Sequence, residues 1–178
     1  MKNILVSLCL LFFTNLVFAS GDSINYSKID HWETAVYSYD VWQYRRGFAP
    51  EPTDWNQTDF DASSWFEGMG GIGYGDGDDV TEILPTQSLF MRHEFSVTDI
   101  SKIEGAFFHA DYDDGFVAYL NGLEIAREGV SGVNPAYNTL ANPGHEAELY
   151  NGGQPSVYKV DLNLLQSGEN VLAIQVHN

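Results

Sequence analysis

The chain has 178 residues, of which 25 are acidic and 8 are basic, and its formal net charge is −17 at pH 7. A field of that sign repels nucleic acid and anionic membrane surfaces, so we exclude both as partners. Aromatic residues make up 14% of the chain, which indicates a packed core rather than disorder. The length suits one domain, and we expect a monomer.

The first 19 residues have the pattern of a secretory signal peptide. Lys2 precedes an apolar run from Ile4 to Phe18, and the small residue Ala19 stands where a signal peptidase cleaves. Polar residues follow at once, whereas a membrane-spanning helix needs about 20 apolar residues. We therefore predict cleavage after Ala19 and a secreted or cell-surface protein. Cleavage also removes Cys9, so the mature chain forms no disulfide.

Residues 20–39 are interpreted as a lead-in segment before the domain proper, which we place at 40–178. The lead-in contains Gly21-Asp22-Ser23, which resembles the nucleophile turn of GDSL-type esterases, with Ser23 as the nucleophile. The later sequence blocks of those enzymes and their βα alternation are missing. An esterase is therefore a remote alternative, and we expect no enzymatic activity.

From residue 40 onward, short runs rich in Val, Ile, Phe and Tyr alternate with Gly, Asn, Asp and Pro clusters, which predicts many strands and turns. The alternation in 88–97 predicts a half-buried antiparallel strand with Arg92 on its polar face. Asn121-Gly122 predicts a two-residue hairpin turn, because both positions need positive φ. Two stretches, 68–85 and 129–154, are predicted as long loops, which often carry function. Further strands are predicted at 106–110, 116–120, 123–127, 156–162 and 170–177.

Against this background, the string DYDDGFVAYLNGLEIAR (111–127) resembles the hallmark of galactose-binding-like β-sandwich domains. Residues 42–79 resemble the opening of those domains, in which a Trp-containing strand leads to a Gly-Tyr-Gly-Asp loop. The version that is most similar accompanies spore-coat-kinase-like or lamin-tail-like domains in large bacterial secreted proteins. The resemblance implies a jelly-roll β-sandwich of two antiparallel sheets. Such domains usually continue beyond the position of Asn178, so we expect a fragment of a longer protein.

Aromatic rings are the first candidates for ligand contact, because the C–H faces of sugars stack on them. Trp55, Trp65 and Tyr74 belong to loop-rich sequence and are expected to be the better exposed rings. Arg92 either grips a ligand or forms a structural ion pair. The full set of candidate platforms is Trp32, Trp42, Trp55, Trp65, Tyr74 and Tyr119, of which Trp42 and Tyr119 are expected to be buried.

Acidic residues provide the second group of candidates. Asp113 and Asp114, with Asn121, are candidate ligand-binding residues at the hairpin, and the alternative is that the aspartates only form a tight turn. Calcium is the candidate cofactor, because carboxylate oxygens suit hard cations. The candidate metal ligands are Asp76, Asp78, Asp79 and Asp111. Their spacing fails the EF-hand template, and a solvated acidic loop is an equal alternative.

The sequence thus predicts a secreted, non-catalytic module that binds carbohydrate and serves as an accessory domain of a larger extracellular protein. The alternative is a structural or protein-interaction domain that packs against neighbouring domains. The exposure of Trp55, Trp65 and Tyr74 discriminates between these two functions.

Overall fold

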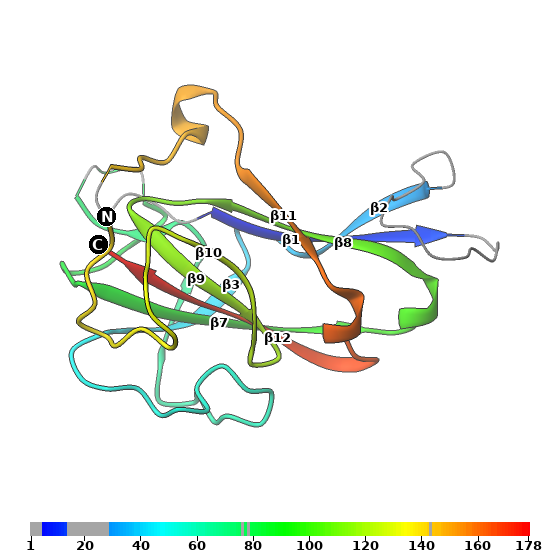
Figure 1. Cartoon of the computed structure of the whole chain (residues 1–178), viewed down its shortest axis with the longest axis horizontal. Coiled ribbons are helices and arrows are strands. Elements are labelled where there is room, and N and C mark those ends of the chain that lie inside the picture. Colours follow the sequence, from blue (N-terminus) through cyan, green and yellow to red (C-terminus); the bar gives the residue numbers. More distant parts are fainter. Residues whose placement is uncertain (1–4, 14–28, 76, 78, 143) are drawn as a thin grey trace.

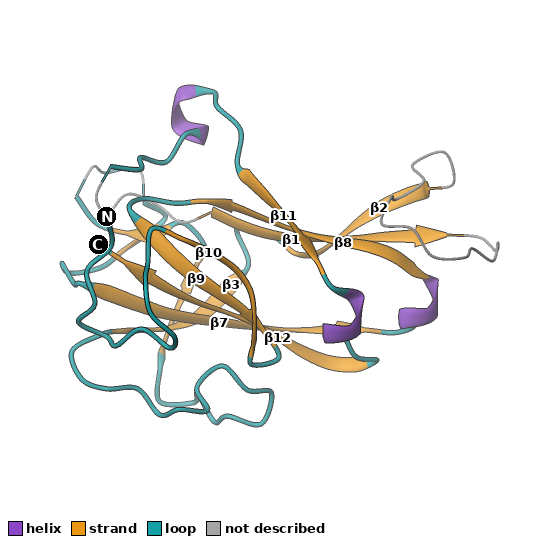
Figure 2. Ribbon diagram, viewed as in Figure 1, coloured by secondary structure: helices purple, strands orange, loops and turns teal. Residues whose placement is uncertain are grey.

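The computed structural model describes residues 5–13, 29–75, 77, 79–142 and 144–178. Two antiparallel sheets lie face to face, and short 3-10 helices and loops connect their strands (Figures 1 and 2). The predicted all-β sandwich of two antiparallel sheets is therefore confirmed. Among the described residues, no helix combines the length and apolar character that crossing a membrane requires.

The smaller sheet has four strands in the order β11, β8, β1, β2, and the larger has six in the order β10, β9, β12, β7, β3, β4. The four-stranded sheet comprises β11 Ser156–Val160, β8 Ile103–Asp111, β1 Leu5–Phe13 and β2 Ile29–Val36. The six-stranded sheet comprises β10 Leu123–Glu128, β9 Gly115–Leu120, β12 Gly168–His177, β7 Ser88–Val97, β3 Val41–Arg46 and β4 Phe66–Met69. A short parallel pair, β5 Ile72–Gly73 and β6 Thr81–Glu82, lies within the predicted loop 68–85. The 3-10 helices are η2 Ile100–Lys102, η3 Leu149–Asn151 and η4 Leu162–Leu164.

The hairpin between β9 and β10 forms at the predicted place. Asn121 and Gly122 have φ values of +52° and +84°, as a two-residue turn requires. Asn121 also ties the hairpin to the start of β12: its side-chain oxygen accepts from the Val171 amide at 2.8 Å, and its amide nitrogen donates to the Leu164 carbonyl at 2.8 Å. The hydrogen bonds of Asn121 therefore serve the fold, and its side chain does not present a free amide to a ligand.

β1 lies inside the segment that the sequence predicts as a signal peptide, and β2 lies inside the predicted lead-in. β1 pairs antiparallel with β8 on one side and with β2 on the other, so it is a central strand of its sheet. The predicted cleavage position and Ser23 lie outside the described residues. Cleavage after Ala19 therefore stays a prediction.

The main core fills the space between the sheets. Its largest fully buried members include Trp42, Phe108, Phe116 and Leu172, which come from both sheets. The burial of Trp42 confirms the sequence prediction, because this tryptophan alternates inward from β3.

A second hydrophobic cluster covers the outer face of the six-stranded sheet. Phe90, Val117 and Tyr119 point away from the first core, and segments 47–65 and 129–142 fold over them. The first of these segments is the cyan loop beneath the sheet in Figure 1. This cover leaves the central strands β9, β12 and β7 of the six-stranded sheet largely buried on both faces. It also explains why Tyr119 is buried as predicted.

Candidate functional site

Trp55 and Trp65 belong to the second cluster and are not exposed platforms. Only 7% of Trp55 and 8% of Trp65 is accessible to solvent. Their rings stack at 6.3 Å between centroids, and Trp55 also meets Phe90 and Tyr119 edge-on. The expectation that these two tryptophans are exposed is wrong, because loop 47–65 turns its rings toward the sheet rather than toward water.

Tyr74 is half-buried, and its hydroxyl both donates and accepts a hydrogen bond. The hydroxyl donates to the Thr86 carbonyl at 3.1 Å and accepts from the side-chain amide of Asn178 at 3.0 Å. The ring packs against the main core. Tyr74 is therefore less exposed than the sequence suggests, and it joins the β5 region to the end of β12.

Arg92 holds loop 47–65 on the sheet. Its side chain is fully buried, and its guanidinium donates to the carbonyls of Phe60 and Gln57 at 2.6 and 3.1 Å. The partly exposed Glu94 lies 3.2 Å from the same group. Burial lowers the pKa of Arg92, and the carboxylate of Glu94 opposes that shift. The structural alternative predicted for Arg92 thus fits, and a ligand in solvent does not reach it.

The aspartates before the hairpin bind the second long loop to the sheet. Asp111 is 4% exposed, and its carboxylate accepts from the amides of Glu148 and Leu149 at 2.7 and 3.2 Å. The amide of Asp114 donates to the His145 carbonyl at 3.0 Å. The His145 ring stacks on Tyr112, with 4.0 Å between centroids. Asp113 is buried and Asp114 adopts a φ of +59°, as in a tight turn.

We expect Asp111→Ala to destabilise the domain by about 1.5–3 kcal/mol, because the amides of Glu148 and Leu149 lose a buried, charged acceptor. Chemical unfolding followed by tryptophan fluorescence measures the change. Asp59→Ala removes an exposed carboxylate and is the matched control, with an expected change within about 0.5 kcal/mol. Equal stability of the two variants would show that Asp111 does not anchor the loop.

The acidic loop gives no metal centre among the residues that the structure describes. No group of three or more His, Cys, Asp or Glu side chains in that part of the chain could hold a metal ion. Asp76 and Asp78 lie outside the described residues. The carboxylate of Asp79 lies so close to Gly73 that a Cβ at Gly73 would clash with it. The carboxylate of Asp111, the last residue of β8, already accepts from the amides of Glu148 and Leu149.

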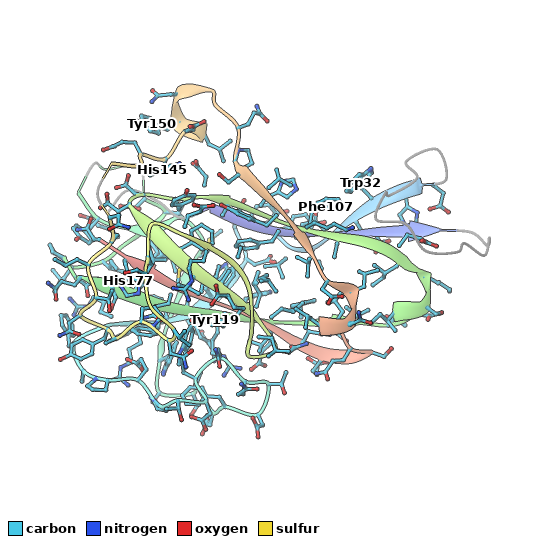
Figure 3. All side chains as sticks on the ribbon, in the orientation of Figure 1. Trp32, Phe107, Tyr119, His145, Tyr150 and His177 are labelled. Carbon is cyan, nitrogen blue, oxygen red and sulfur yellow. The ribbon has the colours of Figure 1, made fainter. Side chains whose placement is uncertain are left out.

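His177 is a buried histidine at the end of β12 (Figure 3). Its Nδ1 donates to the Thr139 carbonyl at 2.8 Å, which secures the segment over the six-stranded sheet. Burial lowers the pKa of His177, the hydrogen bond to Thr139 opposes this, and the positive charge of Arg127 adds to it.

Because the folded state disfavours protonated His177, the unfolded chain takes up more protons near its ordinary pKa of about 6.5. Stability is therefore present above that pH and falls as the pH drops from about 7 to about 5. We expect His177→Gln, which retains a hydrogen-bond donor, to flatten this dependence in urea unfolding at stepped pH. Burial lowers the pKa of His109 as well, so part of the slope remains. An unchanged slope would contradict the prediction.

An exposed tryptophan and a partly buried phenylalanine lie together on the outer face of the four-stranded sheet. Trp32 on β2 is 52% exposed, and its ring lies 6.0 Å from that of Phe107 on β8. Figure 3 shows both rings on the side of the sheet that faces away from the second sheet. Val157, which is 55% exposed, and Lys159 pair with the β8 residues His109 and Phe107 on this face.

We call this surface, made by Trp32, Phe107, Val157 and Lys159, the outer aromatic face. The sequence includes Trp32 among six possible aromatic platforms but does not distinguish it from the other five. Phe107 has the sequence pattern of an ordinary apolar strand residue. The available signal is that Asp30 and Thr34, the residues two positions before and after Trp32 on the same strand face, are both polar, so that face has no apolar stripe.

No protein-family model matches the sequence, and no curated protein matches it. Among solved structures, the chain is similar to a β-glucuronidase of Bifidobacterium dentium complexed with coumarin-3-O-glucuronide, with 14% identity and a TM-score of 0.50. That match covers 78% of this chain and 19% of the β-glucuronidase chain. The likeness is one of fold.

Two other structures have lower TM-scores. A β-glucuronidase from an uncultured Clostridium sp. has 17% identity and a TM-score of 0.47, over 79% of this chain and 21% of that chain. A glycosyl hydrolase family 2 member from Bacteroides cellulosilyticus has 13% identity and a TM-score of 0.45, over 78% and 17%. The chain therefore spans about a fifth of the length of these structures.

Proposed function

We propose that this chain is a secreted, non-catalytic, galactose-binding-like module that binds neutral carbohydrate within a larger extracellular protein. The observation that carries the proposal is the outer aromatic face, where a half-exposed tryptophan lies against a phenylalanine of the same sheet. A sugar ring stacks on such a surface through its C–H groups. The fold shared with part of a β-glucuronidase supports a carbohydrate context.

Asp30 lies two residues before Trp32 in β2, whereas His31 and Glu33 alternate to the opposite face of this strand. The exposed His31 bonds to the carboxylates of Asp30 and Glu33 at 2.6 and 3.3 Å, and these contacts raise the pKa of His31. Carboxylates accept hydrogen bonds from hydroxyl groups, whereas they repel an anionic sugar. The net charge of −17 acts in the same direction. The net charge of the chain therefore favours a neutral glycan over a uronate.

Calorimetric titration of the secreted protein against neutral glycans tests the proposal. We expect weak saturable binding that falls about tenfold, or ~1.4 kcal/mol, in Trp32→Ala, because the stacking ring is lost. Phe66→Ala removes an aromatic ring that is 63% exposed on the opposite sheet, and it should leave the affinity unchanged. Equal loss in both variants would exclude the outer aromatic face as the binding site.

A second function, packing against a neighbouring domain, is favoured by the burial of Trp55 and Trp65. The outer aromatic face would then be covered by protein rather than by sugar. The same titration separates the two functions, because a packing surface gives no heat with any glycan. Protection of Trp32 from oxidative labelling, seen only when the neighbouring domain is present, would support packing.

We also propose that the loop 75–79 binds calcium as a structural ion. Glycines next to carboxylates allow the chain to fold closely around a hard cation. We expect calcium to raise the thermal unfolding midpoint by a few degrees and a chelator to reverse the rise. In the matched variant Asp79→Asn the calcium effect should weaken. A midpoint that does not respond to calcium or chelator would exclude the ion.

A further inference from the structure

β1 occupies the middle of the four-stranded sheet. Its register with β8 runs from Leu5 opposite Asp111 to Phe12 opposite Ile103, and its register with β2 runs from Leu8 opposite Val36 to Phe13 opposite Ile29. β2 has no other neighbour in this sheet. The four-stranded sheet is therefore continuous only while a strand lies between β8 and β2, as Figure 1 shows for the dark blue arrow.

The same nine residues, 5–13, lie within the predicted signal peptide. Their removal would leave a gap one strand wide, because neighbouring strands are about 4.8 Å apart. β8 and β2 would each present unpaired backbone groups to this gap, and such groups pair readily with another strand. The fully buried side chains of Val36, Ala106 and Phe108 would also lose part of their cover.

The gap defines the chemistry of a strand that fills it. On the inner side an incoming strand meets the core residues Ala106, Phe108 and Ala110, so its inward positions must be apolar. On the outer side it lies between Trp32 and Phe107, which favours apolar or small uncharged residues there too. The strand must be extended, about nine residues long by the span of β1, and antiparallel to both neighbours.

The end of β12 lies where such a strand would enter. Leu5, the first residue of β1, pairs with Asp111 at the end of β8, and His177 pairs with Gly115 at the start of β9. Asp111 and Gly115 are joined by three residues, so both positions lie at one end of the sandwich. A segment that follows Asn178 in a larger protein would therefore enter at the correct end and with the polarity of β1.

We propose that the secreted form of this domain accepts a donor strand between β8 and β2, and that an apolar, extended segment of the neighbouring part of the same larger protein supplies it. The inference rests on the secretion included in the proposed function. Strand addition of this kind combines main-chain hydrogen bonds with side-chain pockets. The leader occupies the gap before cleavage, and the donor strand restores the sheet and the outer aromatic face afterwards.

The mass of the exported protein gives the first test. We expect the protein recovered outside the cell to lack residues 1–19. Retention of residues 5–13 in the exported protein would overturn the proposal, because β1 would then remain in its own place. This result would leave the glycan titration interpretable, so the two proposals fail independently.

The second test compares two forms of the mature chain 20–178. One form carries the sequence of residues 5–13 after Asn178, joined by a Gly-Ser linker of ten residues that spans roughly 17 Å. The control form carries the same addition with Leu8→Pro and Leu10→Pro, which removes strand-forming amides without changing the length. Both forms carry an apolar tail of the same length, so association between molecules through this tail should affect them equally.

We expect the unaltered addition to raise the thermal midpoint by at least ~8 °C over the proline control. Amide hydrogen exchange in β8 and β2 should slow by about 100-fold. Equal midpoints and equal exchange would overturn the proposal. So would a dimer of the unextended mature chain in which β8 is already protected, because a second copy would then fill the gap. Glycan binding by the strand-completed form measures the proposed function separately.

Discussion

Trp65→Ala is expected to lower the free energy of unfolding by about 3–5 kcal/mol, which is the usual cost of removing a large aromatic side chain from a core. Trp65 is 8% exposed and contacts Trp55 in a stacked arrangement and Phe60 edge-on. Loop 47–65 has no strand of its own, so these ring contacts hold it on the sheet. Truncation leaves a cavity between the loop and Tyr119, a residue of the same cluster.

Denaturant unfolding of the variant and of Trp32→Ala provides a matched comparison between a buried and an exposed tryptophan. Trp32 is 52% exposed, so its truncation should cost less than about 1 kcal/mol. Trp65, which the sequence suggests is exposed, should therefore matter more for stability than Trp32. A Trp65→Ala variant as stable as the unmodified protein would show that the second cluster does not form.

Arg92→Met is expected to cost about 2–4 kcal/mol, because two partly buried carbonyls lose a charged donor that is itself fully buried. Methionine fills much of the space, so the loss reports on the bonds to Phe60 and Gln57 rather than on a large cavity. The cation–π contact of the guanidinium with the Phe60 ring, at 5.4 Å, is lost as well. Urea unfolding and proteolysis within 47–65 should both respond, because the loop loses its central attachment.

Arg46→Met is the control for a change of charge. Arg46 lies over the exposed ring of Phe48 at 4.5 Å, and its loss should cost less than about 1 kcal/mol. Arg92→Lys should recover only part of the stability, since an ammonium does not reach two carbonyls with the planar fork of arginine. Full recovery with lysine would indicate that charge, and not the hydrogen-bond geometry, is the essential property.

The two predictions share a physical cause. Loops that read as polar connections cover the outer face of a sheet that is apolar on both sides. Phe90 and Arg92 alternate on the face of β7 that the sequence assigns to solvent, and both are buried beneath the loops. A surface that is covered in this way does not offer the stacking platform that Trp55 and Trp65 suggest by their position in the chain.

At the second long loop, too, residues that suggest a ligand site in the sequence make contacts within the fold. Asp111, Asp113 and Asp114 form the most acidic part of the hairpin approach, and acidic pairs near glycine suggest a ligand site. The carboxylate of Asp111 instead caps the backbone of η3, and the Asp114 amide meets His145. The partners of these hydrogen bonds lie more than 30 residues away in sequence, so no local sequence pattern predicts the bonds.

The local structure of this protein follows from short stretches of its sequence. Period-two alternation gave the positions of β7, β9, β10 and β12, and Asn121-Gly122 gave the hairpin, because both signals depend on neighbouring residues and on backbone sterics. The tertiary structure decided which faces are covered. Burial of Trp55, Trp65 and Arg92, exposure of Trp32, and the strand at residues 5–13 all depend on contacts between segments that are distant in the chain, and an apolar run has the same composition in a leader as in a central strand.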